Sequence, residues 1–191
     1  MNRFLSAGID RGWRKKAIKM FAPDNPKIIL DVATGTADMA IMATKLLPVE
    51  KIIGIDISKL MLDMGRKKIE KEGLAAKIEL YSGDVETINH SNNTFDGIMV
   101  AFGVRNFEHL ETGLKEMLRV LKPGAQLIVL EFSKPKWRAM RKLYNLYMGI
   151  VAPQVARWFR QNKDAYVYLN ESSKAFPERN QFTEILKSAG F

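Results

Sequence analysis

Short apolar runs alternate with longer amphipathic stretches through the first two thirds of the chain. The apolar runs fall at residues 27–32, 51–56, 77–81, 95–100 and 126–132. Runs of this length, bounded by turn residues, are typical of buried parallel strands. The stretches between them predict helices at 39–47, 58–72 and 110–121. Alternating strands and helices predict an α/β fold with a doubly wound, mostly parallel sheet and helices on both faces.

The loop after the first strand is the first candidate binding site. Three apolar residues lead into Asp31, and a turn of small residues, 33–37, then leads into a helix. Such a loop leaves backbone N–H groups unpaired beside the positive end of a helix dipole, where a polar ligand binds. Asp56 ends the second strand, 21 residues after Gly35. An acid at this position can accept both ribose hydroxyls of an adenosine.

The same loop distinguishes between nucleotide-like cofactors. A dinucleotide site shows a G-x-G-x-x-G pattern after the first strand, whereas this chain has Ala33, Gly35 and Ala37 in the corresponding turn. Asp31 would repel a pyrophosphate but would attract the ammonium group of a methionine moiety. The pattern therefore favours S-adenosylmethionine over NAD.

Composition excludes several other kinds of site. The 191 residues include no cysteine, which rules out disulfides, thiolate–zinc sites and a cysteine nucleophile. His90 and His109 have no other potential metal ligands at suitable spacing in the sequence. We therefore expect solvated or capping roles for them, and no metal site is predicted. No apolar run approaches the length of a membrane span and no secretory signal opens the chain, so the default expectation is a cytoplasmic protein.

The net charge of +9 is concentrated in two segments. Residues 1–27 carry a net +5 and residues 134–163 a net +8, so the rest of the chain is mildly acidic. Apolar residues recur at helical spacing within 1–22 and 136–160. Clustered charge beside apolar stripes suits an anionic surface, so contact with a membrane at its inner face is a hypothesis for both segments.

Motifs along nearly the whole chain resemble the ubiquinone/menaquinone biosynthesis C-methyltransferase family, within the class I S-adenosylmethionine-dependent methyltransferases. The matching stretches are Ser6–Ile9, Trp13-Arg14, Asp31–Asp38, Asp56–Ser58, Met61-Leu62, Asn93–Asp96, Phe102–Asn106, Arg119–Gly124, Leu130–Pro135, Tyr168-Leu169 and Ser188–Phe191. The resemblance implies a Rossmann-like fold and methylation of a ring carbon of a prenylated quinol. Bacterial members of this family convert demethylmenaquinol to menaquinol.

The resemblance also implies a set of cofactor contacts for S-adenosylmethionine, with S-adenosylhomocysteine as the product. Combined with the loop argument, the predicted cofactor residues are Asp31, Ala33, Gly35, Thr36, Asp56, Ile57, Asp84, Val85 and Ala101. Ala101 stands where the family usually has a serine, so that side-chain hydrogen bond is absent. The first loop also has fewer glycines than in most family members.

Catalysis on a quinol requires a group that takes the hydroxyl proton or stabilises the resulting anion. Arg105 follows the fourth strand, where class I active sites face the methyl group, and it is our main candidate. Asn106 is expected to orient it. Glu131, at the end of the fifth strand, is a further candidate base.

The predicted organisation is one methyltransferase domain over residues 1–191. It comprises a helical N-terminal cap at 1–26, a cofactor-binding core at 27–133, a helical substrate lid at 134–165 and a C-terminal helical part at 166–191. Class I methyltransferases finish with an antiparallel strand pair, and this chain stops before it, so we expect the pair to be lacking here. The sequence leaves open whether the protein forms a homodimer.

Two other functions compete with quinol methylation. The basic charge also suits a methyltransferase acting on RNA or on another small molecule. However, Ala101–Val104 stands where an exocyclic-nitrogen RNA methyltransferase would carry an Asn/Asp-Pro-Pro-aromatic motif, so no nucleic-acid partner is expected. A non-catalytic module that only binds S-adenosylmethionine is the remaining alternative.

Overall fold

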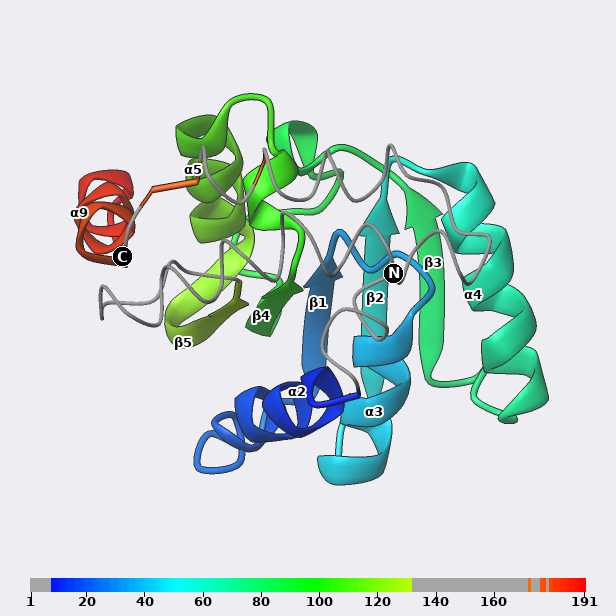
Figure 1. Ribbon diagram of the computed structural model, residues 1–191. Helices are drawn as coiled ribbons and strands as arrows, with labels where there is room; N and C mark the ends of the chain where they lie inside the picture. The colour runs from blue at the N-terminus through cyan, green and yellow to red at the C-terminus, as the bar shows by residue number, and fades with distance from the viewer. Residues whose placement is uncertain (1–7, 132–171, 173–175, 178) are drawn as a thin grey trace. The chain divides into compact units, whose positions relative to one another are not determined.

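The computed structural model describes residues 8–131, 172, 176, 177 and 179–191 (Figure 1). The chain divides into two compact units, one of Met1–Glu131 with Ile185–Phe191 and one of Phe132–Glu184. The first unit contains the sheet and the candidate site. The predicted substrate lid at 134–165 lies outside the described residues.

Five parallel strands form the sheet, in the order β3-β2-β1-β4-β5 (Figure 1). The strands are β1 (Ile28–Val32), β2 (Lys51–Asp56), β3 (Ile78–Ser82), β4 (Phe95–Ala101) and β5 (Leu121–Leu130). The first four confirm the strands predicted from the apolar runs to within one residue at each end. In the described part of the chain no further strand follows β5.

The start of the fifth strand was predicted wrongly. The sequence predicts that Lys122-Pro123-Gly124 stops the helix and that the strand starts at Gln126, yet β5 begins at Leu121, directly after helix α5. Leu121 pairs with Phe95 and Gln126 pairs with Gly97, so an irregularity in the ladder absorbs the residues between them. A proline fits such a bulge because it needs no ladder hydrogen bond there.

The helices also match the predicted stretches closely. They are α2 (Asp10–Lys19), α3 (Asp38–Leu46), α4 (Lys59–Lys71), α5 (Leu110–Val120) and α9 (Arg179–Ala189), with 3-10 turns η1 (Val85–Thr87) and η2 (Val104–Asn106). Ser58 caps α4 by accepting a hydrogen bond from the Met61 N–H. Gly73 follows that helix with a positive φ of 67°, the conformation that ends many helices.

Helices cover both faces of the sheet. Because the chain moves from β1 to β3 in one direction and from β4 to β5 in the other, right-handed crossovers place α3 and α4 on one face and α5 on the opposite face. Strands covered on both sides need apolar residues throughout. In β1, accordingly, Ile29, Leu30 and Val32 are all buried.

Helix α2 packs against α3 and β5. The chain after α2 is fixed by Phe21, which is fully buried. A methyl group on Gly97 would lie 2.7 Å from Phe21 Cε1, so the glycine lets the ring lie directly on β4. This packing brings the N-terminal helix, which lies far in sequence from β4 and β5, to the edge of the candidate site.

None of the helices that the structure describes combines the length and the apolar character of a membrane span. The strand order reverses between β1 and β4, and in open α/β sheets ligands bind beyond the carboxyl ends of the strands at such a point.

Candidate functional site

The loop between β1 and α3 alternates left-handed with ordinary backbone conformations. Ala33, Gly35 and Ala37 have φ angles of 52°, 57° and 61°. Glycine adopts this region freely, whereas an alanine methyl crowds the following carbonyl oxygen. The loop therefore has the shape of a glycine-rich ligand loop, although two of its three left-handed positions are alanine.

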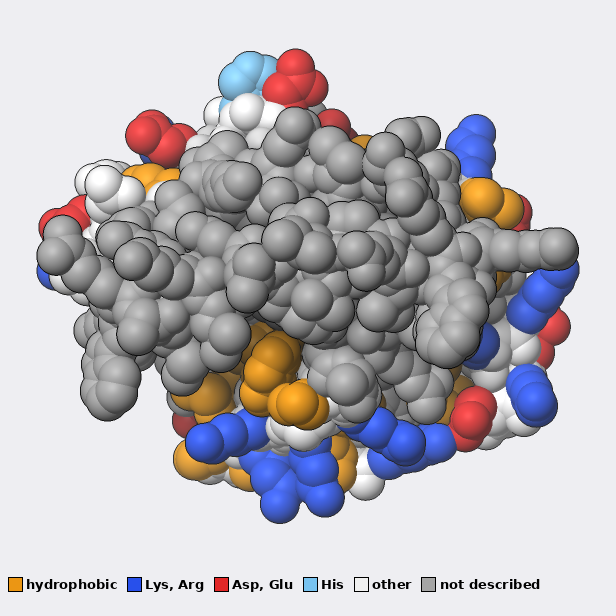
Figure 2. Space-filling model, viewed as in Figure 1, with side chains coloured by type: hydrophobic (Ala, Val, Ile, Leu, Met, Phe, Trp, Pro, Cys, Tyr) orange, Lys and Arg blue, Asp and Glu red, His pale blue; other side chains and the backbone are white. Residues whose placement is uncertain are grey.

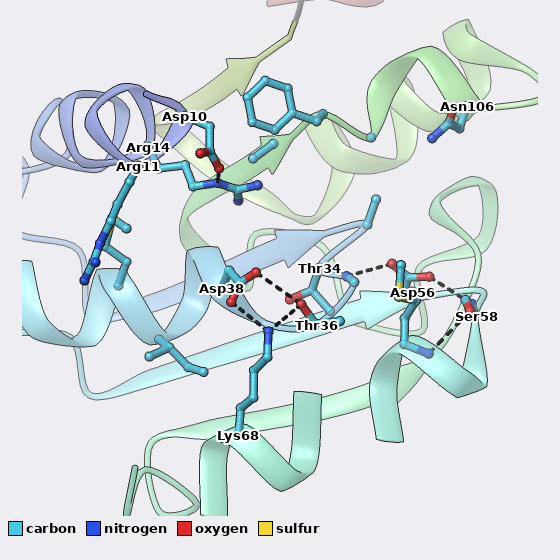
Figure 3. A pocket seen from close by; sticks show the side chains of 18 of the residues that line it. Asp10, Arg11, Arg14, Thr34, Thr36, Asp38, Asp56, Ser58, Lys68 and Asn106 are labelled. Atoms are coloured by element: carbon cyan, nitrogen blue, oxygen red, sulfur yellow. Dashed lines mark hydrogen bonds and ion pairs between the residues drawn. The ribbon is translucent and has the colours of Figure 1, made fainter. Parts of the chain in front are cut away.

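Side chains from α3 and α4 hold this loop in place. Lys68 Nζ donates hydrogen bonds of 2.8 Å to Thr36 Oγ1 and to Asp38 Oδ1, and Thr36 donates to Asp38 (Figure 3). Helix α4 comes this close because Gly65 faces the loop: a methyl there would lie 3.3 Å from the Thr36 carbonyl carbon. The loop is therefore preorganised by contacts within the protein.

Asp56 connects the ends of β1 and β2. Its Oδ2 accepts a hydrogen bond of 2.8 Å from the Gly35 N–H, and its Oδ1 accepts one of 2.8 Å from the Ser58 N–H. Each carboxylate oxygen has a second lone pair. The carboxylate is thus fixed in orientation and retains acceptor capacity for a pair of ligand hydroxyls.

Asp31 lies beneath the loop and is almost completely buried. Its Oδ2 accepts a hydrogen bond of 2.6 Å from Thr34 Oγ1. Burial raises the pKa of Asp31 from 3.8 to about 7, although the Thr34 hydrogen bond and the charge of Arg14 oppose this shift. The side chain supports the loop from below, and Thr34 stands between it and the pocket.

The raised pKa of Asp31 predicts a pH-dependent stability. The native state holds the proton more tightly than the unfolded chain, so this group's contribution to stability is largest below about pH 4 and is lost as the pH rises towards 7. Asp31→Asn keeps an acceptor for Thr34 and removes the buried charge. We expect it to raise the free energy of unfolding by about 2–4 kcal/mol at about pH 8 and by much less at about pH 4.

Urea denaturation of both proteins across this pH range measures the effect. Asp24→Asn changes an exposed aspartate and should shift neither curve. Equal stability of wild type and Asp31→Asn at the upper pH would contradict a buried carboxylate of raised pKa.

A cavity of about 790 Å³ lies over the loop (Figure 3). It brings together seven of the predicted site residues: Ala33, Gly35, Thr36, Asp56, Ala101, Arg105 and Asn106. They come from the ends of β1, β2 and β4, as expected for a site at the point where the strand order reverses.

Five predicted residues do not line this cavity. Asp31 is buried below it, and Ile57 is 74% exposed. Asp84 is exposed and caps η1 by accepting from the Glu86 N–H, and Val85 is buried in that turn. Glu131 contacts the site through Arg105.

Arg105 and Glu131 form a buried ion pair. Arg105 Nη1 lies 2.5 Å from Glu131 Oε1, and both side chains are 5% exposed. The Arg105 N–H also donates a weaker, 3.4 Å hydrogen bond to Glu131 Oε2. Because β4 and β5 are neighbours, the residues that follow them meet at the sheet edge. Two of the three candidate catalytic residues therefore form one unit, in which the Glu131 carboxylate orients the Arg105 guanidinium.

Several residues that line the cavity were not predicted as site residues from the sequence. Asp10, Arg11 and Arg14 come from α2, Phe102 follows β4, and Lys68 comes from α4. Asp10 and Arg14 are four residues apart in a predicted helix, which is ion-pair spacing, but the spacing does not reveal where the helix packs. Among the described residues, no group of histidine, aspartate and glutamate side chains is arranged to hold a metal ion.

The lining fits S-adenosylmethionine. A fixed carboxylate at Asp56 suits ribose hydroxyls, and the acids near the loop suit the cationic sulfonium and ammonium groups while opposing a pyrophosphate. A five-stranded parallel sheet with this loop and this acid at its carboxyl edge defines a class I methyltransferase. A solved S-adenosylmethionine-dependent methyltransferase from Aquifex aeolicus has the same fold, with a TM-score of 0.57 and 26% identity over 65% of this chain and 66% of that one.

The match extends to a particular family. Residues 1–191 match the ubiE/COQ5 methyltransferase family, and the chain belongs to it. It is 44% identical over 191 residues to a demethylmenaquinone methyltransferase of Bacteroides fragilis, covering all of this chain and 78% of that protein. It is 40% identical over 192 residues to the ubiquinone/menaquinone biosynthesis C-methyltransferase UbiE of Geobacter sulfurreducens, covering all of this chain and 75% of that one.

Haemonchus contortus phosphoethanolamine N-methyltransferase 2, solved with S-adenosylmethionine, shares the fold, with a TM-score of 0.68 and 18% identity over 94% of this chain and 36% of that one. The protein is an S-adenosylmethionine-dependent methyltransferase of this family.

Proposed function

We propose that the protein methylates a ring carbon of a prenylated quinol, with a demethylmenaquinol as the specific substrate and S-adenosylhomocysteine as the second product. The observation that carries the proposal is the buried Arg105–Glu131 pair, whose arginine lines the same cavity as the cofactor loop, in a chain whose relatives bear the names of quinone methyltransferases. A fixed cation in this wall suits a substrate that becomes an anion when it reacts.

The cofactor supplies an electrophilic methyl group, so the protein must make the acceptor carbon nucleophilic. Loss of a quinol hydroxyl proton spreads negative charge to the ortho ring carbon. Once that carbon is methylated, its hydrogen leaves as a proton and the ring oxygen regains one. Arg105 has one of two roles in this proposal. It stabilises the charge of the quinolate directly, or it positions a water molecule that accepts the hydroxyl proton. Glu131 holds the guanidinium in place and is a positioning residue in this proposal. Asn106 lines the cavity one residue further along η2 and supplies a second polar contact.

Methyl transfer from labelled S-adenosylmethionine tests the proposal. The substrates are chemically reduced demethylmenaquinol, the oxidised quinone, a demethyl-benzoquinol and bulk RNA. We expect label on the reduced naphthoquinol alone, because only the quinol can become an electron-rich anion. Label on RNA with none on either quinol would overturn the assignment, and cofactor binding without any transfer would favour the non-catalytic module.

We also propose that the protein meets this substrate at an anionic membrane surface, through the outer face of α2. Ile9, next to the helix, and Met20 just after it are 58% and 60% exposed, and Trp13 between them is 41% exposed. Lys15, Lys16 and Lys19 are exposed on the same helix, and no carboxylate of the described residues pairs with them. Figure 2 shows lysine and arginine side chains gathered at the lower edge, where Figure 1 places α2 and α3. Exposed apolar residues beside lysines suit a phospholipid surface.

Vesicle flotation tests the α2 face. We expect binding to vesicles that contain phosphatidylglycerol, little binding to phosphatidylcholine alone, and loss of about a hundredfold in affinity when Lys15, Lys16 and Lys19 are all changed to Glu. The same change at the exposed Lys59, Lys67 and Lys77 is the matched control. Equal losses in the two triple variants would show that net charge alone matters and would overturn the assignment to α2.

A further inference from the structure

Arg14 is a nearly buried cation whose role the sequence motifs do not explain. Its side chain is 13% exposed, and Nε lies 3.4 Å from Asp10 Oδ2 on the previous turn of α2. The guanidinium carbon lies 5.1 Å from the centre of the Phe102 ring, a cation–π contact. Among the described residues, no acceptor binds the two terminal nitrogens. Because Arg14 lines the cavity, two guanidinium nitrogens without a protein acceptor leave donors there that suit an anionic ligand.

An anionic ligand would reach the two terminal nitrogens of Arg14 from the cavity. Figure 3 shows the Arg14 side chain extending from α2 towards the space above Asp38, whereas Arg11 of the same helix runs in another direction. Asp10 and Phe102 hold the Arg14 side chain from two sides, so its planar fork is preorganised. An arginine fork of this kind matches the two oxygens of a carboxylate.

The sheet order fixes which end of the cofactor would meet Arg14. Asp56 ends β2 on one side of β1, and Phe102 follows β4 on the other side. A cofactor with its ribose at Asp56 crosses the end of β1 and presents its amino-acid end towards β4. Arg14 stacks on the residue that follows β4, and Asp31, which feels the charge of Arg14, lies beneath the loop between them.

We propose that Asp10, Arg14 and Phe102 form a carboxylate-binding subsite for the amino-acid end of the cofactor. Arg14 binds the carboxylate, and Asp10 positions the guanidinium. The inference rests on the proposed function only in taking this cavity as the cofactor site. It adds a source of selectivity: adenosine thioethers without the amino acid should bind poorly for lack of this contact.

Calorimetric titration with two ligands tests the subsite. S-adenosylhomocysteine carries the amino acid, and 5′-methylthioadenosine has the same nucleoside and thioether without it. We expect Arg14→Met to weaken S-adenosylhomocysteine about 10- to 100-fold, as for a lost charged hydrogen-bond pair, and to leave methylthioadenosine within about twofold. Arg14→Lys, which keeps the charge but loses the fork, should give an intermediate loss. Arg66→Met, which changes an arginine outside the cavity, should change neither.

A second variant separates binding from folding. Arg14→Met leaves the buried Asp10 without this partner, so Asp10→Asn with Arg14→Met removes both charges and should show the same ligand selectivity with a more stable fold. Equal weakening of both ligands, or no weakening of either, would overturn the subsite. An unchanged affinity for S-adenosylhomocysteine with a raised KM for the quinol would also overturn it, since Arg14 would then contact the acceptor substrate. If wild type binds neither ligand, the cofactor assignment of the cavity itself is wrong.

Discussion

Changing Arg105 to methionine will lower the free energy of unfolding by about 3–5 kcal/mol and abolish methyl transfer. Both members of the Arg105–Glu131 pair are buried to the same degree, so removing the cation leaves the Glu131 carboxylate in the protein interior without this ion-pair partner. The loss of stability is measured by urea denaturation, and the loss of activity by transfer of labelled methyl to the reduced quinol.

The double variant Arg105→Met with Glu131→Leu separates the two roles of this pair. Apolar side chains of similar size often replace a buried ion pair without loss of stability. We therefore expect stability close to that of wild type, with activity still absent. Arg66→Met is the matched control, because Arg66 pairs with Asp63 in an exposed position and such pairs contribute about 1 kcal/mol or less. Activity in the stable double variant would show that Arg105 only maintains the fold.

Changing Asp56 to asparagine will weaken S-adenosylhomocysteine about 100-fold. The carboxylate is held by Gly35 and Ser58, and in the proposed site its remaining lone pairs accept the two ribose hydroxyls. Hydrogen bonds to a charged acceptor contribute about 1.5–3 kcal/mol each, and an asparagine retains only one of the two acceptor oxygens. Calorimetric titration measures the change directly.

The Asp56 variant should weaken methylthioadenosine by the same factor, because that ligand keeps the ribose. This pattern is the opposite of the one expected for Arg14→Met, so the two variants together orient the ligand in the cavity. Asp63→Asn, at an exposed aspartate outside the cavity, serves as the control. If Asp63→Asn matched the effect of Asp56→Asn on both ligands, the ribose assignment would fail.

The apolar runs predicted the sheet well because parallel strands covered on both faces leave little room for polar residues. The same runs located Asp56, since an acid at the end of a buried strand interrupts the pattern visibly. Lys122-Pro123-Gly124 was misread because a turn motif has the same composition as a bulge in a strand. Only the pairing partner, β4, distinguishes the two.

The site was predicted less completely than the sheet. Loop and strand-end residues such as Thr36 and Arg105 are close to the site in any fold of this type, so topology and motif were sufficient to find them. Arg14 reaches the cavity because Phe21 packs on Gly97, a contact between distant parts of the chain that no local spacing encodes. Arg105 and Glu131 were each singled out, but their pairing follows from the adjacency of β4 and β5 and depends on the strand register.

The contact between Ala33, in the first loop, and Gly103 restricts the order in which these two residues can be substituted during evolution. A methyl group on Gly103 would lie 2.5 Å from Ala33 Cβ, and its other neighbours are at ordinary contact distances. Gly103→Ala alone should therefore destabilise the protein by about 1–3 kcal/mol, whereas Ala33→Gly, at a left-handed position, should be close to neutral. With Ala33→Gly already present, Gly103→Ala should cost little. Denaturation of the two single variants and the double variant measures how the cost of Gly103→Ala depends on residue 33. Substituting Ala33 first gives a route of small stability changes, whereas substituting Gly103 first passes through a destabilised protein.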